Sequence, residues 1–472
     1  MELMYMLSII YYILIILVVI ILLTTLLWPD WSIHNLISSN NKNNNTGTVD
    51  EDSIEESAID STIDRNIESD IELKKYNHQL KLEDSIDNNT DGIKFKDFLE
   101  LIKDDEFIIN YKKSLLESLN EKKVIYTEKL NQCTNDLNMS RSKPKQGILG
   151  THDSNVELLE VCHRELEDIL NVIDKRIKTL STTRIKQDFN HMLYNNKKGF
   201  ASIIGRENVK DMLVLQIYSF SKNYKVFLHN FQNVAIYGNA GIGKTKLAET
   251  MSYIYAKSGI LVRRKYRFYT KKDFTSQYVH ESARLTYKLL LSNLEGVSFI
   301  DEAYSLASGG MGMKLVDHAT EYISEIVNFL DKYIGLSIVI VAGYEKRMES
   351  EFMGSNEGMS GRFPNKIVLE DYDSEQLTKI LIKFIKDSDG DIKFTEKDYN
   401  CLYTFIDYLY KNVTGIFKKQ ARDMKTLSST ILKTIYSSKQ YDWITNDTKN
   451  NVHLLLSGLN NYLKEYKIHL SL

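Results

Sequence analysis

The chain has 472 residues, a formal net charge of −3 and 43% hydrophobic residues. This length favours about three domains, and a charge so close to zero excludes a general electrostatic attraction to nucleic acid. The three cysteines, Cys133, Cys162 and Cys401, lie far apart and form no CxxC pair. Their spacing argues against a disulfide framework or a zinc site and favours a reducing compartment.

The first hydrophobic segment runs from Met4 to Trp28, 25 residues without a charged side chain. A helix of this length spans a hydrocarbon core of about 30 Å. A cleaved signal peptide is disfavoured because there is no basic n-region or small-residue cleavage site. A buried core helix is seldom apolar on every face. Residues 1–30 are therefore predicted to be a single-pass transmembrane anchor, whose orientation the flanking charges leave open.

Residues 31–95 are rich in Asn, Ser and acidic residues and offer too little apolar surface to offset the entropy of ordering. They are predicted to be a disordered linker, with an acidic docking tail as the alternative. Residues 96–190 then carry two runs of apolar residues at helical spacing. The runs predict an α-helical hairpin with Cys133 and Cys162 as structural thiols on its apolar faces. Intermolecular coiled-coil pairing is the alternative.

A glycine-rich loop at residues 238–245 follows an apolar run and precedes a helix-forming run. In this setting, backbone N–H groups turn around phosphate oxygens, Lys244 supplies a positive charge and Thr245 ligates Mg²⁺. The loop therefore predicts a binding site for ATP and Mg²⁺. Its residues are Gly238, Asn239, Ala240, Gly241, Ile242, Gly243, Lys244 and Thr245.

Strand and helix patterns alternate from about Phe200, which is typical of a parallel sheet flanked by helices. The third predicted strand ends in Asp301 and Glu302, at the sheet edge where ligands bind in open α/β folds. Asp301 is predicted to organise Mg²⁺ and Glu302 to accept a proton from the attacking water. The predicted strands are residues 234–237, 261–269, 297–300, 337–341 and 366–369.

We thus predict an α/β P-loop nucleotide-binding domain at residues 191–370, followed by a helical lid and C-terminal tail at residues 371–472. Lid helices are expected to start near Ser374 and Thr395, and an amphipathic stretch covers residues 452–466.

Three segments resemble the CbbX/CfxQ branch of AAA ATPases, which includes red-type rubisco activases and stage V sporulation protein K. They are GVSFIDEAYSL at residues 296–306, IVIVAGY at 338–344 and GMSGR at 358–362. The resemblance covers roughly residues 198–440 and implies an AAA module that binds and hydrolyses ATP with Mg²⁺. In this branch Ala-Gly-Tyr344 replaces the asparagine that general AAA modules carry.

The resemblance implies further site residues. Ile204 and Gly205 match the segment that contacts adenine. Arg362 matches the arginine finger that reaches the γ-phosphate of a neighbouring subunit, and Arg422 matches the sensor arginine of the lid. Tyr278 matches the aromatic residue of the central pore loop, although a histidine, residue 280, replaces the usual glycine nearby.

Together these features predict a membrane-anchored AAA ATPase that forms an oligomeric ring with itself, hexameric by resemblance, and remodels an unidentified protein client. The use of ATP indicates that the ATPase domain faces the cytosol. The alternative is a membrane tether or scaffold in which ATP binding only regulates oligomerisation. Rubisco activation itself is not favoured, because motors of one type act on different clients.

Overall fold

The structure is a computed structural model that describes residues 93–142, 151–276, 281–307, 313–390, 392, 394–413, 415–437 and 451–465. All of them belong to one compact unit, Gly92–His469. The predicted anchor from Met4 to Trp28 and the predicted pore-loop residue Tyr278 lie outside the described residues. Within the described ranges, no helix is long and apolar enough to cross a membrane.

Five strands form one sheet in the order β2-β3-β4-β1-β5, and every pairing is parallel. The central strands β1, β3 and β4 are buried along nearly their whole length, as expected for a parallel sheet covered on both faces. This confirms the predicted α/β module. The strands are β1 (Val234–Gly238), β2 (Tyr266–Tyr269), β3 (Val297–Ile300), β4 (Ile338–Gly343) and β5 (Asn365–Leu369).

Helices and short helical turns precede the first strand and connect the later ones. The longer ones are α8 (Glu207–Lys222), α10 (Lys244–Ser258), α12 (Glu281–Leu291) and α14 (Met313–Lys332). The shorter ones are η2 (Phe200–Ser202), α9 (Lys225–Leu228), α11 (Lys271–Phe274), α13 (Tyr304–Ala307), α15 (Glu345–Arg347), η3 (Met348–Phe352), η4 (Met353–Ser355) and α16 (Met359–Arg362).

The second strand is shorter than predicted, and side chains satisfy backbone groups of its first two predicted residues, 261 and 262. The Leu261 carbonyl accepts a hydrogen bond from Arg176 at 3.2 Å, and the Val262 N–H donates to the Glu295 carboxylate at 3.0 Å. Backbone groups that side chains already satisfy are not available to a strand ladder. The apolar pattern alone therefore overestimates the length of β2.

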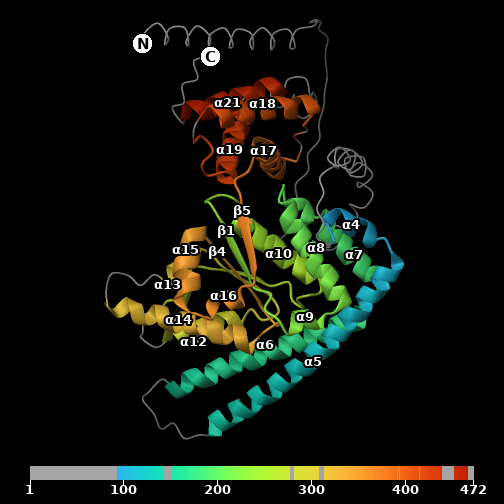
Figure 1. Ribbon diagram of the computed structural model, residues 1–472, viewed down its shortest axis with the longest axis vertical. Helices are drawn as coiled ribbons and strands as arrows, with labels where there is room; N and C mark the ends of the chain where they lie inside the picture. The colour runs from blue at the N-terminus through green and yellow to red at the C-terminus, as the bar shows by residue number, and fades with distance from the viewer. Residues whose placement is uncertain are drawn as a thin grey trace, which may run out of the picture. The chain divides into compact units, whose positions relative to one another are not determined.

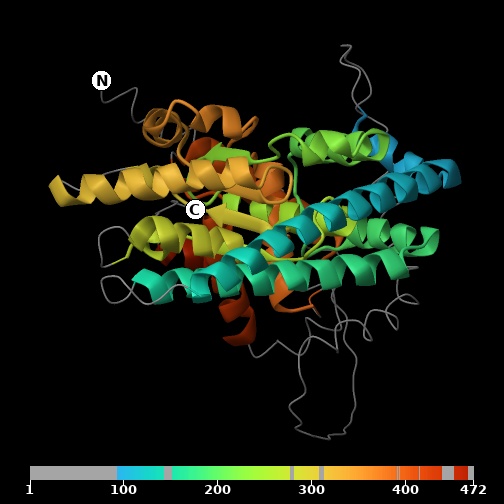
Figure 2. The same cartoon turned by 90° about the horizontal axis from the view of Figure 1, so that it is seen from below.

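Two long helices, α5 (Asp105–Ser142) and α6 (Thr151–Thr179), lie side by side along the module (Figures 1 and 2). The smaller helices α4 (Phe95–Leu101) and α7 (Thr182–Tyr194) flank them. Helix α5 also packs on α8, and α6 packs on α12. An aromatic cluster fills the space between α4, α5, α7 and α8; its members are Phe98, Phe107, Tyr111, Phe189 and Phe220. The hairpin is thus part of the module's core.

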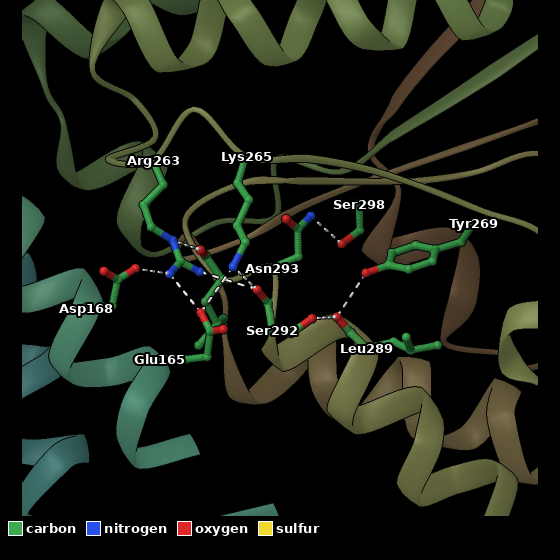
Figure 3. A network of polar contacts seen from close by, with 10 residues as sticks. Glu165, Asp168, Arg263, Lys265, Tyr269, Leu289, Ser292, Asn293 and Ser298 are labelled. Carbon is green, nitrogen blue, oxygen red and sulfur yellow. Dashed lines mark hydrogen bonds and ion pairs between the residues drawn. The ribbon is translucent and has the colours of Figure 1, made fainter. Parts of the chain in front are cut away.

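Polar contacts join α6 to the residues just before β2, as Figure 3 shows. Arg263 donates from Nη1 to the carboxylates of Glu165 and Asp168, both at 2.8 Å. The Lys265 ammonium also donates to Glu165, at 3.2 Å. Arg263 is only 7% exposed, so its charge depends on these acidic partners from the hairpin.

A deeper contact joins α5 to the loop before β3. The Glu295 carboxylate is fully buried and accepts hydrogen bonds from Lys122 Nζ at 2.7 Å and from the Tyr126 hydroxyl at 3.0 Å. Lys122 is itself 1% exposed and also donates to the Ile260 carbonyl at 2.9 Å. Buried charges persist only when they are paired and hydrogen-bonded, so this pair requires the hairpin to dock in one register.

We expect Glu295→Ala to lower the free energy of unfolding by about 3–5 kcal/mol, because it leaves the Lys122 ammonium buried without its partner. Urea unfolding followed by circular dichroism measures the loss. Adding Lys122→Met to Glu295→Ala should recover part of this loss in stability, because it removes the unpaired buried charge. As the control, Glu100→Ala removes a carboxylate from an exposed ion pair with Lys103 and should leave the urea midpoint unchanged. If Glu295→Ala and Glu100→Ala lowered the free energy of unfolding equally, the result would contradict the role of Glu295 in docking the hairpin.

Four helices form the lid, α17 (Ser374–Ser388), α18 (Glu396–Asn412), α19 (Ala421–Ser437) and α21 (Asn451–Glu465), and they group together in Figure 1. Helix α17 begins as predicted near Ser374, but its N-cap is Asp373, whose carboxylate accepts the Gln376 N–H at 2.7 Å. Thr395 caps α18. The amphipathic stretch predicted at residues 452–466 forms α21, which packs on α19.

Candidate nucleotide site

The glycine-rich loop joins β1 to the N-terminus of α10, at the carboxyl edge of the sheet. Lys244 is 7% exposed, and its Nζ donates to the carbonyls of Gly238 at 2.8 Å and Asn239 at 2.9 Å. Burial lowers the pKa of this ammonium, and the nearby carboxylates of Asp301 and Glu302 oppose that effect. These two backbone carbonyls hold the Lys244 ammonium inside the loop. Phosphate oxygens are stronger acceptors than carbonyl oxygens, so a bound nucleotide would compete with the carbonyls for this ammonium.

Asp301 and Glu302 follow directly after β3, on the side of the sheet that holds Lys244. Burial raises the pKa of both carboxyl groups, and the charge of Asp301 raises the pKa of Glu302 further. Glu302 has a φ of 52°, a left-handed conformation that costs a residue with a side chain about 1–2 kcal/mol. The fold therefore imposes a strained backbone at the residue predicted to activate water.

The protein offers Mg²⁺ few ligands at this site. Among the described residues, no group of three or more His, Cys, Asp or Glu side chains could hold a metal ion. The predicted ligands are the exposed hydroxyl of Thr245 and the half-buried carboxylate of Asp301. This set fits Mg²⁺ in a nucleotide site, where the ion takes one or two protein oxygens and completes its octahedron with phosphate oxygens and water.

The lid touches the glycine-rich loop. A Cβ on Gly241, whose φ is 78°, would collide with the backbone carbonyl of Lys419 and lie 3.2 Å from the Cβ of Arg422. Glycine is therefore required here both by conformation and by space. The Gln420 side chain, itself 4% exposed, accepts the backbone N–H of Tyr372 at 2.9 Å. The structure thus brings the lid arginine, Arg422, beside the loop predicted to hold phosphates.

The predicted adenine segment, Ile204 and Gly205, lies against the lid helix α17. A Cβ on Gly205 would approach Nε2 of Gln376 to 2.7 Å. The next residue, Arg206, places its guanidinium 4.2 Å from the ring centroid of Tyr372. Two nitrogens of this guanidinium are buried without a hydrogen-bond partner among the described residues. Sequence reasoning missed Arg206, because its stacking partner is remote in the chain.

Arg362 is engaged within its own chain. Its Nε donates to Asp331 Oδ1 at 2.9 Å, Nη2 donates to Oδ2 of the same carboxylate at 2.5 Å, and Nη1 donates to the Gly358 carbonyl at 2.6 Å. None of these bonds reaches the glycine-rich loop. Asp331 was not predicted as a site residue. Its position near the C-terminus of α14, where the helix dipole disfavours an anion, is the signal that could have marked it.

Tyr344 and Tyr304 form an aromatic wall beside Lys244. A Cβ on Gly343 would come within 2.8 Å of the Tyr304 ring, so the Ala-Gly-Tyr segment needs its glycine. The Arg347 guanidinium lies 3.7 Å from the centroid of Tyr304, and Lys244 Nζ lies 5.4 Å from the centroid of Tyr344. Both contacts suit the attraction between a cation and an aromatic face.

The site geometry agrees with comparisons to known proteins. Residues 234–367 match the family described as "ATPase family associated with various cellular activities (AAA)". These residues form an AAA module. The relatives described next support the CbbX/CfxQ-like branch, as the sequence motifs predicted.

The AAA module has several curated relatives. The chain is 25% identical to a putative cfxQ-like protein of Acanthamoeba polyphaga mimivirus, over 58% of this chain and 63% of that protein. It is 33% identical to stage V sporulation protein K of Bacillus subtilis, over 31% and 44%. It is 30% identical to the chromosomal protein CbxX of Cupriavidus necator, over 40% and 56%. The chain thus spans less than two thirds of each relative's length.

Proposed function

We propose that the chain is an ATPase that uses Mg²⁺ and works as an oligomeric ring on a protein client. The observation that carries the proposal is the convergence of Lys244, Asp301 and Glu302 at the carboxyl edge of the sheet, with Arg422 of the lid beside them. This set supplies a phosphate-binding cation, a carboxylate for the Mg²⁺ shell and a general base, three of the parts that phosphoryl transfer to water uses.

Each residue has a separate task in the proposed reaction. The backbone of residues 238–245 and the Lys244 ammonium bind the β- and γ-phosphates, and Asp301 orients the Mg²⁺ shell. The Glu302 carboxylate accepts a proton from the attacking water. A site that only bound ATP would have no need for the last group, so Glu302 favours hydrolysis over the tether or scaffold alternative.

Arg362 supports a ring. Its guanidinium is hydrogen-bonded to Asp331 and Gly358 of its own chain, and none of these bonds reaches the glycine-rich loop. A finger that cannot act on its own nucleotide acts on that of a second copy, through a head-to-tail interface that closes by rotation. The pair with Asp331 is partly exposed, at 20% and 45%, and so is weak enough for a γ-phosphate to displace it.

Asp331→Asn should release Arg362 and make assembly easier. A partly exposed pair contributes at most about 1 kcal/mol, so we expect the protein concentration at half-maximal ATP turnover to fall by no more than about fivefold. Turnover measured over a dilution series tests this. Arg347 also pairs with a carboxylate, so Glu351→Gln is the matched control and should leave the concentration dependence unchanged. If Asp331→Asn instead raised the protein concentration at half-maximal turnover markedly, Asp331 would have a structural role.

The client and the membrane are parts of the proposal that require their own tests. Client remodelling predicts that the client stimulates ATP turnover, whereas a scaffold predicts constant turnover. The uncharged segment from Met4 to Trp28 supports single-pass anchoring, and the use of ATP supports an ATPase domain in the cytosol. The full chain should then resist alkaline extraction from membranes, and protease added from the cytosolic side should digest the AAA module.

A further inference from the structure

A cavity of about 410 Å³ lies between the α5–α6 hairpin and helices α12 and α14. Its wall carries two cysteines, two lysines and two tyrosines whose hydroxyls share a hydrogen bond at 2.9 Å. The proposed ATPase mechanism uses none of these groups. They are Cys133, Cys162, Lys129, Lys332, Tyr287 and Tyr333.

The two thiols come from neighbouring helices and line the same cavity. Cys133 lies on α5 and Cys162 on α6. The Cys133 thiol donates to the Leu159 carbonyl at 3.4 Å, one turn before Cys162 on the same helix. Both cysteines are free, and Cys162 is only half-buried. Cys133 is buried from the outer surface, but both thiols line the cavity, so a reagent that enters it can reach them.

The surroundings make the two thiols unequal. The hydrogen bond from Cys162 lowers the pKa of Cys133 despite its burial, and the charge of Lys332 lowers it further, whereas Asp136 opposes both. The hydrogen bond with Cys133, together with burial, raises the pKa of Cys162. One thiol is thus favoured as the thiolate nucleophile and the other is held protonated, as in dithiols that exchange with disulfides.

We propose that Cys133 and Cys162 form a dithiol modification site, which low-molecular-weight disulfides oxidise reversibly to a bond across the hairpin. The Cys133 thiolate attacks one sulfur of the small disulfide, and the first small thiolate leaves. Cys162 then loses its proton and attacks the sulfur of Cys133, which expels the second small thiolate. The two protein thiols are oxidised, the small disulfide is reduced, and the two thiol protons end on the two small thiols.

Disulfides in a reducing compartment are usually transient and regulatory, which suits a reversible bond at a cavity better than a structural one. The third cysteine provides an internal comparison. Cys401 lies on α18, and burial raises its pKa to about 11, so it carries less thiolate at neutral pH. The proposal is independent of the ATPase activity.

The test treats the purified full chain with glutathione disulfide and then blocks the remaining thiols with an alkylating reagent. We expect the intact mass to equal the starting mass minus two hydrogen atoms plus one alkylation adduct, with one peptide linking Cys133 to Cys162 and with the adduct on Cys401. Dithiothreitol added before the alkylating reagent should reopen the bond, so that all three cysteines are then alkylated. Cys401→Ser should behave like the original chain, whereas Cys133→Ser should form no internal bond.

Two charge variants distinguish an electrostatic effect on the Cys133 thiolate from a general loosening of the hairpin. Lys332→Gln removes a positive charge that favours the thiolate and should slow bond formation by roughly twofold to tenfold. Asp136→Asn removes a negative charge that opposes the thiolate and should accelerate it by a similar factor. Changes of the same sign in both variants would refute thiolate control by these charges.

The site assignment itself fails if Cys133 and Cys162 stay reduced while Cys401 reacts. It also fails if the linked peptides come from two different chains, which a reducing and a non-reducing gel distinguish. Circular dichroism of each variant before treatment establishes that the hairpin is folded, so that a missing bond in a folded variant counts against the proposal.

Discussion

Glu302→Gln is expected to lower ATP turnover by about 10²- to 10⁴-fold, the usual contribution of a general base, and to leave ATP affinity unchanged. The amide has the size and shape of the carboxylate, but it cannot accept a proton from water. Lys244 and the rest of the glycine-rich loop, which hold the phosphates, are untouched. Phosphate release under saturating ATP measures turnover, and a fluorescent nucleotide measures binding.

The matched control is Glu370→Gln. Glu370 is an exposed carboxylate directly after β5, at the same edge of the sheet, and its substitution removes the same charge. It should turn over ATP normally. Normal turnover by Glu302→Gln itself would remove that residue from its assigned role. If the variant binds ATP and stalls, it also provides the means to trap a client for identification.

The same residue predicts a pH dependence. Burial and the adjacent Asp301 raise the pKa of Glu302, and the base must be ionised to act. Turnover should therefore be present above this raised pKa and fall as the pH decreases through it, at a higher pH than for an ordinary glutamate. The residual turnover of Glu302→Gln should not show this decrease at low pH, because the amide does not titrate.

Arg362→Ala should lower turnover by about 10³-fold or more if the residue acts as an arginine finger. Because the finger and the glycine-rich loop of one site come from different copies, two inactive variants should rescue each other. In an equal mixture of Arg362→Ala and Lys244→Ala, about a quarter of head-to-tail interfaces combine an intact loop with an intact finger. We therefore expect roughly that fraction of the original turnover.

Arg141→Ala is the control for this experiment, because Arg141 is an exposed arginine that also pairs with a carboxylate, that of Glu160. It should retain full turnover. Sedimentation of the mixture in ATP reports assembly independently of catalysis. A chain that remains strictly monomeric at the working concentration, or a mixture without any rescue, would argue against action between copies.

Much of the AAA module could be predicted from local sequence patterns. The glycine-rich loop could be recognised from the sequence, because phosphate binding depends on consecutive backbone groups and one adjacent lysine. Asp301 and Glu302 could be placed for a similar reason, since they end a buried strand whose carboxyl edge must face the ligand. The hairpin helices follow from apolar spacing, because that periodicity reflects the face that each helix buries.

The interactions between remote segments were decided only by the tertiary structure. Lys122 and Glu295 are 173 residues apart in the chain, and nothing near either one indicates a buried partner. The same is true of Arg206 on Tyr372 and of Asp331 beside Arg362. Sequence periodicity reports which face of an element is buried, whereas the identity of a polar partner depends on how the elements meet.

By itself, the sequence determined the phosphate loop, the acidic end of β3, the parallel sheet and the branch of AAA proteins that these features resemble. The tertiary structure decided that the N-terminal hairpin belongs to the module, that the lid arginine lies beside the loop and that Arg362 pairs within its own chain. It also brought together Cys133 and Cys162, which the sequence suggested were separate structural thiols. The physical reason is that local chemistry is encoded in neighbouring residues, whereas charge pairing, stacking and thiol contact require distant residues to be packed together.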